Sequence, residues 1–424
     1  MKPVSQSGQK RSFRAKAFSL AHGTVGAQII VAAAMPILSR LYDPIDFGLL
    51  AVFTSFLTLL AGIFSLKYEQ AIFLPGDARE ARDVSRLMLA LVTLCSFLTL
   101  ALVIIGDFSG QLHAQAYLYI LPAALVIVAL QNIGQIWSSR LQAFGEYAKS
   151  ALLNAGTNIG LALAFCWLPS GTMLVLAYVG GLAASAVYLI TRNRDVFQAI
   201  WREARRPLWP SFWTYRQFPL HVLPISLLSS FSYQVMPILI THYFDVAITG
   251  NYAAANRVLV LPSILIGNTI GEAFRSEFML RLRAGTDHRD LFYKILAFIL
   301  VGGIAAYSLI WLIAPLALET LLGEKFHDAG LYARYLTFGV FGNFLIQPVI
   351  FVFVALRRTG ASLLLQVLLA IASIGGFLWG AHQGSIAQAL IASSIASFVG
   401  AAITMLLALK FVHDSNAGEY SAQI

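Results

Sequence analysis

The 424-residue chain is poor in charge, because Asp, Glu, Lys and Arg together make up only 12% of it. Soluble domains carry roughly 25% of such residues, so this scarcity indicates that lipid surrounds most of the chain. The only two cysteines, Cys95 and Cys166, fall in apolar stretches, and we expect neither a disulfide framework nor a metal site. Strand-length segments of alternating polarity are also missing, which argues against a β-barrel.

Common signatures of catalysis are missing as well. The sequence contains no G-x-x-x-x-G-K-[ST] loop and no H-E-x-x-H motif, and no acidic pair lies within its apolar stretches. We therefore expect no enzymatic activity, no cofactor and no bound metal. Energy for any transport is expected from an ion gradient or from the substrate gradient.

Hydrophobic residues make up 58% of the chain and gather in stretches of about 20, the length that an α-helix needs to cross a membrane. The sequence predicts an all-α integral membrane protein with about twelve spans. The predicted spans are residues 17–39, 47–66, 86–106, 116–138, 150–168, 172–191, 219–242, 250–271, 291–314, 333–355, 362–380 and 387–410. No cleavable leader is recognised, so the first span is expected to be retained.

Positive charge alternates from one connection between spans to the next. With both chain ends in the cytoplasm, nearly all of the 29 lysines and arginines lie on the cytoplasmic side; the exceptions are Arg40, Arg257, Lys325 and Arg334. This is the positive-inside pattern, and it supports an even number of spans. It also explains the net charge of +9 without nucleic acid, which we do not expect as a partner.

The longest connection runs from Arg192 to Pro219. Its arginines and three tryptophans, Trp201, Trp209 and Trp213, suit a segment at the level of the lipid headgroups. Two interpretations are open, a site for anionic lipid and a solvated cytoplasmic linker. The sequence favours the linker.

Two similar segments lie about two hundred residues apart, MPILSRLYDPIDFG from Met35 and MPILITHYFDVAITG from Met236. The first ends the span 17–39 and the second ends the seventh span; the second copy has one inserted residue. A seventh span that repeats the first indicates two parallel six-helix lobes around a central cleft, an architecture of alternating-access transporters. We predict that these lobes are residues 1–205 and 206–424.

Each copy places a proline near the end of its helix, Pro36 and Pro237. Proline removes a backbone hydrogen bond and bends a membrane helix, so we expect both to take part in gating. The alternative is that prolines are simply common in membrane helices.

The segment Pro36 to Pro75, PILSRLYDPIDFGLLAVFTSFLTLLAGIFSLKYEQAIFLP, resembles the N-terminal signature of Wzx-type oligosaccharide flippases. In that family a Pro-Ile-Leu-x-Arg-Leu-Tyr-x-Pro-x-x-Phe-Gly turn precedes a helix that ends in Arg-Tyr-Glu-x-Ala-Ile. Lys67 stands where the family usually has arginine, which keeps the charge but loses the bidentate fork. GNYAAANRVLVLPSILIGNTIGEAF, from Gly250 to Phe274, is similar to the family's eighth helix.

The resemblance implies the MATE-like fold of the multidrug/oligosaccharidyl-lipid/polysaccharide exporters, a V-shaped pair of lobes in a bacterial inner membrane. It implies that the chain flips a polyprenyl-diphosphate-linked oligosaccharide to the outer leaflet, for lipopolysaccharide O-antigen, capsule or exopolysaccharide. The expected partners are this substrate, membrane lipids, a polysaccharide polymerase and a chain-length regulator.

A diphosphate needs cations, and charged residues within membrane spans are rare and usually functional. Arg257 lies about two turns into its predicted span, and we expect it to bind the diphosphate. A structural pair with an acid of another helix is the alternative. Arg40 is a second candidate ligand, although Asp43 and Asp46 follow it and favour a capping or loop salt-bridge role at least as strongly.

Several further residues are candidates for binding or gating. For Lys67 and Glu69 three roles are open: an intracellular gate, a binding site for the substrate diphosphate, or an ordinary charge pair at a helix end. Two polar pairs have helical spacing, Gln131 with Gln135 and Asn154 with Asn158. Such pairs either line a water-filled cleft, where they contact sugar hydroxyls, or join neighbouring helices. His22 and His221, at loosely equivalent places in the two lobes, are candidates for proton coupling, although plain hydrogen bonding is favoured. Glu272, a candidate for gating, is expected to pair with Arg275.

Two other function classes compete with the flippase. A cation-coupled multidrug exporter of the same fold generally needs a buried carboxylate, but no acid precedes Asp43 in the first span or Asp245 in the seventh. A membrane polysaccharide polymerase or glycosyltransferase usually has large outer loops, and here the longest, PLALETLLGEKFHDAG, is short. Both observations favour the flippase.

Overall fold

The computed structural model describes residues 6–109, 116–203, 207–263, 268–283, 287–356 and 358–414, with side chains given from Gly23 onwards at most positions. Within these ranges the chain is helical and has no strand, as predicted. Ten candidate membrane spans are found among the described residues. The predicted span 219–242 coincides with α10 (Leu223–Tyr243), and 250–271 runs from α11 (Val246–Pro262) into residues outside the described ranges.

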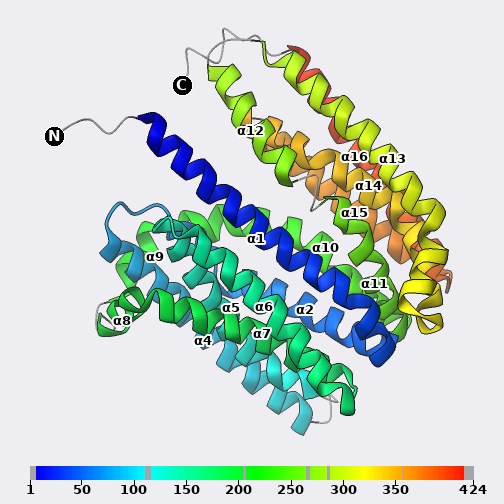
Figure 1. Ribbon diagram of the computed structural model, residues 1–424, viewed down its shortest axis with the longest axis horizontal. Helices are drawn as coiled ribbons and strands as arrows, with labels where there is room; N and C mark the ends of the chain where they lie inside the picture. Colours follow the sequence, from blue (N-terminus) through cyan, green and yellow to red (C-terminus); the bar gives the residue numbers. More distant parts are fainter. Residues whose placement is uncertain are drawn as a thin grey trace. The chain divides into compact units, whose positions relative to one another are not determined.

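The chain divides into two compact units, Met1–Gln234 and Val235–Ile424. The helices of the first unit, which also holds the start of α10, are α1 (Gln6–Leu41), α2 (Pro44–Phe64), α3 (Tyr68–Ala71), α4 (Ala78–Phe108), α5 (Ala116–Arg140), α6 (Phe144–Ala164), η1 (Phe165–Trp167), α7 (Gly171–Arg192), α8 (Arg194–Arg202), α9 (Trp209–Thr214) and η2 (Phe218–Val222). In this unit α5 packs on α2, α4 and α7, and α6 packs on α1 and α7. Figure 1 shows α8 and α9 at one end of the bundle formed by α4 to α7.

The second unit repeats this packing. After the end of α10 and α11, its helices are α12 (Asn268–Arg283), α13 (Arg289–Leu322), η4 (Glu324–Phe326), α14 (His327–Ala355), α15 (Thr359–His382) and α16 (Ile386–Asp414). Here α14 packs on α11, α13 and α16, and α15 packs on α16. If α3 and α12 are set aside, the fourth long helix of each half contacts the second, third and sixth. The shared packing supports the internal repeat, while the predicted lobe boundary at 205/206 stays a prediction.

The repeated sequence forms the same turn in both halves. Asp43 is the N-cap of α2 and Asp245 is the N-cap of α11. The carboxylate of Asp245 accepts a hydrogen bond from the N–H of Ala247 at 3.0 Å, which satisfies one free donor of the helix start. Gly48 and Gly250 are both the fifth residue after their N-caps and both are buried. The repeat therefore encodes a helix end, an aspartate cap and a new helix.

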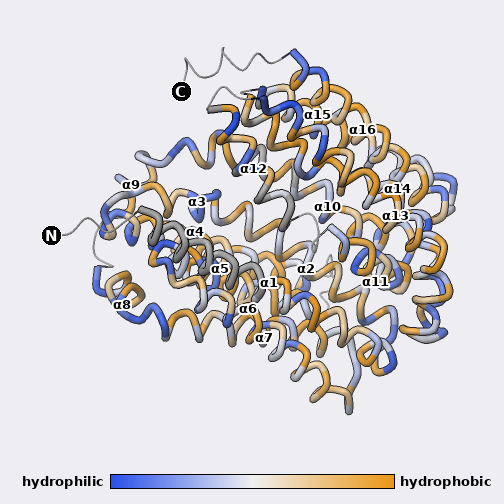
Figure 2. Tube along the Cα trace, turned by 45° about the horizontal axis from the view of Figure 1, so that its top comes forward, coloured by the Kyte–Doolittle hydropathy of each residue, from blue (hydrophilic) through white to orange (hydrophobic). Residues whose placement is uncertain are grey.

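Hydrophobic residues follow the long helices and hydrophilic residues gather at helix ends and in α8 (Figure 2). Many large apolar side chains of the long helices are exposed, among them Phe97, Leu102 and Leu316. A surface of this kind is suited to lipid contact, since a water-soluble protein rarely exposes such extended apolar patches. The protein is therefore a multi-pass membrane protein.

Candidate functional site

The turn between α2 and α4 has an unusual backbone. Leu66 and Lys67 have φ angles of 48° and 60°, in the left-handed region. For residues other than glycine this conformation costs roughly 1–2 kcal/mol each. Glycine would adopt this conformation without that cost, so the backbone here does not by itself favour lysine. We call the segment Ser65–Ile72 the Lys67 elbow.

Two contacts from other helices hold the elbow. The guanidinium of Arg140, at the end of α5, donates to the carbonyl oxygens of Ile72 at 2.8 Å and Pro75 at 2.7 Å. Tyr68 is fully buried, and its hydroxyl donates to the carbonyl oxygen of Phe212 in α9 at 3.2 Å. Burial raises the pKa of Tyr68 to about 12, so the hydroxyl keeps its proton and remains a donor at neutral pH.

Lys67 and Glu69 form an ion pair in the elbow. Lys67 Nζ lies 3.3 Å from Glu69 Oε1, and the two side chains are 18% and 19% exposed. Glu69 Oε2 is buried and has no hydrogen-bond partner among the described residues. A buried oxygen without a partner destabilises the Lys67–Glu69 ion pair, because the oxygen has lost its hydrogen bonds to water and has gained none in the protein. The pair is thus suited to exchange one of its partners for a ligand.

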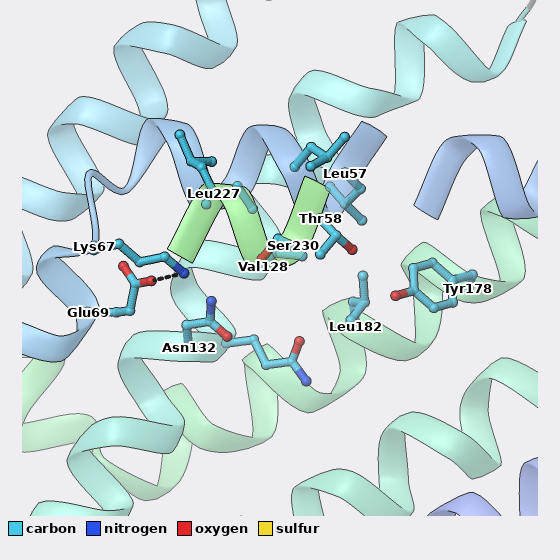
Figure 3. A pocket seen from close by; sticks show the side chains of 14 residues that line it. Leu57, Thr58, Lys67, Glu69, Val128, Asn132, Tyr178, Leu182, Leu227 and Ser230 are labelled. Carbon is cyan, nitrogen blue, oxygen red and sulfur yellow. Dashed lines mark ion pairs between the residues drawn. The ribbon is translucent and has the colours of Figure 1, made fainter. Parts of the chain in front are cut away.

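A cavity of about 260 Å³ adjoins this ion pair, entirely within the first unit. Its lining residues come from α2, the elbow, α5, α7 and the start of α10, and are Leu57, Thr58, Leu59, Ala61, Gly62, Lys67, Glu69, Val128, Gln131, Asn132, Tyr178, Leu182, Leu227 and Ser230. Figure 3 shows Lys67 and Glu69 at one end and Tyr178 at the other, with Asn132 between them. The cavity therefore combines a charged end with amides, hydroxyls and apolar walls.

Three of the predicted site residues meet in this cavity: Lys67, Glu69 and Gln131. The amide of Gln131 also donates to Ser185 Oγ of α7 at 3.0 Å, so it joins two helices as well as lining the cavity. The remaining predicted residues with described side chains are not among the lining residues, and they are Arg40, Gln135, Asn154, Asn158, His221, Pro36, Pro237 and Arg257. Their roles stay predictions.

Several of these residues have defined surroundings. Arg40 is exposed in the last turn of α1, His221 is exposed in η2, and Arg257 is exposed on α11 in the second unit. Arg275 donates to the carbonyl oxygen of Gly271 at 3.2 Å. The side chains of His22 and Glu272 lie outside the described part of the structure, so the predicted pairing of Glu272 with Arg275 cannot be placed.

Thr58, Tyr178 and Ser230 also line the cavity, although no motif in the sequence marks them as site residues. Polar residues also lie near Thr58 and Ser230 in the sequence, for example Thr54 and Ser226, so the sequence alone does not show which of them face a cavity. The sequence also does not predict the left-handed backbone at Leu66 and Lys67, because this conformation is typical of glycine and asparagine.

Asn154 and Asn158 pack against α7. A Cβ on Gly181 would lie 2.6 Å from the carbonyl oxygen of Asn154 and 2.9 Å from Asn158 Cβ. We therefore expect Gly181→Ala to separate α6 from α7 and to destabilise the protein by about 1–3 kcal/mol. Gly160→Ala is the control, since a Cβ there meets nothing within 4 Å and alanine favours the helix. Thermal unfolding in one detergent measures both, and equal melting temperatures would contradict the close packing.

The fold matches solved structures of membrane transporters. An inward-facing multidrug resistance MATE family transporter of the MOP superfamily matches with a TM-score of 0.67 at 15% identity, over 93% of this chain and 94% of its own. The lipid II flippase MurJ, in an inward closed conformation, matches with a TM-score of 0.66 at 14% identity, over 97% and 90%. A MOP superfamily transporter from Pyrococcus furiosus with a binding pocket of reversed polarity has a TM-score of 0.54 at 14% identity, over 94% and 95%. The chain thus has the MATE-like fold of this superfamily of transporters.

Residues 37–330, more than half of the chain, match the family model described as polysaccharide biosynthesis protein. The chain belongs to that family. No curated protein sequence matches it. Family and fold together identify a transporter of the flippase type and confirm the resemblance seen in the sequence.

Proposed function

We propose that the protein flips a polyprenyl-diphosphate-linked oligosaccharide from the cytoplasmic to the outer leaflet of a bacterial inner membrane, by alternating access. The product serves surface polysaccharide assembly, with a polymerase and a chain-length regulator as later partners. Family membership supports a role in polysaccharide biosynthesis, and the MurJ-like fold supports a lipid-linked substrate. The asymmetric distribution of lysine and arginine supports cytoplasmic chain ends.

The observation that carries this proposal is the Lys67–Glu69 pair at the end of a partly polar cavity. A diphosphate offers more negative charge and more acceptor oxygens than one carboxylate, so it competes effectively for Lys67. Displacing Glu69 also ends the arrangement in which its second oxygen lacks a partner. The pair therefore holds the cation in place until the substrate arrives.

The remaining lining suits sugar. Asn132, Gln131 and Ser230 supply amides and a hydroxyl, which can exchange hydrogen bonds with sugar hydroxyls. Tyr178 adds an aromatic face at the end opposite the ion pair. Leu57 and other apolar side chains complete the wall, as is usual for small-molecule sites.

The same geometry disfavours the multidrug exporter. A cationic drug needs a carboxylate that is available to it. Among the described side chains that line the cavity Glu69 is the only acid, and Lys67 lies 3.3 Å from it, so a cationic drug would replace Lys67 with no gain in charge, whereas a diphosphate carries more negative charge than Glu69. We propose no chemical step for this cavity, because substrate binding and release are all that its residues need to perform.

Deletion of the gene in the bacterium that carries it tests the proposal. We expect the lipid-linked oligosaccharide to accumulate on the cytoplasmic leaflet and the surface polysaccharide to disappear. Impermeant lectin applied to right-side-out and inside-out membrane vesicles distinguishes the two leaflets. An unchanged glycan together with new sensitivity to cationic compounds would overturn the flippase and establish the drug exporter.

A further inference from the structure

The connection between α7 and α10 folds back onto the first unit. α8 and α9 both contact α4, which has 31 residues and is about 46 Å long. A hydrocarbon core is only ~30 Å thick, and the apolar part of α4 starts near Leu87, so its first turns lie at headgroup level. We call residues 194–203 and 207–215, whose helices α8 and α9 pack on α4, the interfacial segment.

Polar contacts fix the interfacial segment to the charged start of α4. The guanidinium of Arg82 pairs with the carboxylate of Glu203 at 2.9 Å. The hydroxyl of Tyr215 donates to Glu80 Oε1 at 2.8 Å. Apolar contacts add to these, because Phe197 of α8 is buried in the core of the first unit. The segment is therefore docked rather than a free linker.

The outward face of the segment is aromatic and basic. Trp201, Trp209 and Trp213 are 62%, 65% and 48% exposed. Exposed arginines lie among and beside them, namely Arg194, Arg202 and Arg216. Glu203, one of the two acids of the segment, is already neutralised by Arg82, so positive charge is in excess. Tryptophan favours the membrane interface and guanidinium binds phosphate oxygens, which makes the face complementary to an anionic lipid surface.

The same segment touches the Lys67 elbow. The ring of exposed Trp209 stacks on the ring of Phe212, with centroids 5.5 Å apart. The carbonyl oxygen of Phe212 accepts the Tyr68 hydroxyl, and their rings are 6.2 Å apart. Tyr68 lies in the chain between Lys67 and Glu69. One line of contacts thus leads from the exposed tryptophan to the ion pair.

We propose that the interfacial segment binds the anionic headgroups of the surrounding membrane, and that this binding braces the Lys67 elbow through Phe212 and Tyr68. The proposal concerns lipid that surrounds the protein, not the transported substrate. It stands whether or not the proposed function is correct, and its tests use no substrate.

Lipid binding is tested on the detergent-solubilised full-length protein by thermal unfolding. Phosphatidylglycerol should raise the melting temperature and phosphatidylcholine should not. Arg194→Gln with Arg202→Gln should increase the half-saturating phosphatidylglycerol concentration roughly tenfold or more. Lys294→Gln with Lys410→Gln, which removes two exposed charges from the second unit, should change it little. Equal stabilisation by both lipids, or an equal effect of both double variants, would overturn the proposed surface.

Bracing is tested by hydrogen exchange at residues 65–72. Phosphatidylglycerol should slow exchange there in the wild type. Tyr68→Phe keeps the ring and removes the hydrogen bond to Phe212, so it should retain the lipid-induced rise in melting temperature but lose the slowing. Elbow exchange that does not respond to phosphatidylglycerol in the wild type would refute the brace. Slowing that persists in Tyr68→Phe would refute the route through this tyrosine.

Discussion

Lys67→Gly is expected to reduce transport by roughly 10- to 100-fold while leaving the protein about as stable as the wild type. Glycine adopts the φ of 60° at this position without the cost that lysine incurs, which is roughly 1–2 kcal/mol. Loss of the ion pair offsets part of this gain, because Glu69 then has no cation beside it. Removal of a charged hydrogen-bond donor weakens diphosphate binding by about 1.5–3 kcal/mol, or roughly 10- to 100-fold. Thermal unfolding and a vesicle flipping assay measure the two effects separately.

Lys67→Arg is the matched control for charge. It should retain most transport, because the guanidinium also binds phosphate and arginine is usual at this position in Wzx-type flippases. Lys67→Gly removes the side chain and also relieves the backbone strain, so a loss of transport cannot be blamed on strain. Lys67→Ala would remove the side chain but keep the left-handed strain. Normal flipping by Lys67→Gly would show that Lys67 is a backbone element rather than a ligand.

Arg257→Ala is expected to reduce transport by roughly 10- to 100-fold, and Arg257→Glu to abolish it. Arg257 is exposed on α11 of the second unit, and charged residues within predicted membrane spans are rare and usually functional. Glutamate adds repulsion of the diphosphate to the loss of attraction. Surface polysaccharide in a complemented deletion strain is the measurement, with immunoblots of the membrane fraction to confirm insertion.

Lys294→Ala is the control for Arg257, because it removes an exposed cation from the second unit at a position that is paired with Asp290 on its own helix. It should leave surface polysaccharide unchanged. Full transport by both Arg257 variants would contradict the assigned role, and equal losses in Lys294→Ala would indicate a general effect of charge on insertion.

The sequence predicted the helical membrane fold because lipid imposes a length and an apolarity that appear directly in the residues. The repeat at Met35 and Met236 was equally visible, since an aspartate cap and a glycine at a fixed distance are local features. Tertiary partners were not visible. The stripes on α5 and α6 have the same spacing, yet Gln131 lines the cavity while Asn154 packs on Gly181.

The interfacial segment gives a second example. The sequence favoured a solvated linker between Arg192 and Pro219, because charge and tryptophan alone do not show docking. The ion pair between Arg82 and Glu203 joins residues far apart in the chain, and no local pattern encodes it. Likewise, the contacts that Arg140 and Phe212 make with the Lys67 elbow join residues far apart in the chain, so no local pattern predicts them.

α10 contains residues of both units, and its two halves could bend relative to each other near the boundary between the units. Its first half supplies Leu227 and Ser230 to the cavity wall, and the boundary between Gln234 and Val235 lies just before Pro237. Proline is a usual pivot in a helix. The arm from Pro237 to Leu227 is about 15 Å, so a bend of about 20° at the pivot would carry Leu227 through roughly 5 Å. A displacement of this size would change much of the width of a cavity of about 260 Å³.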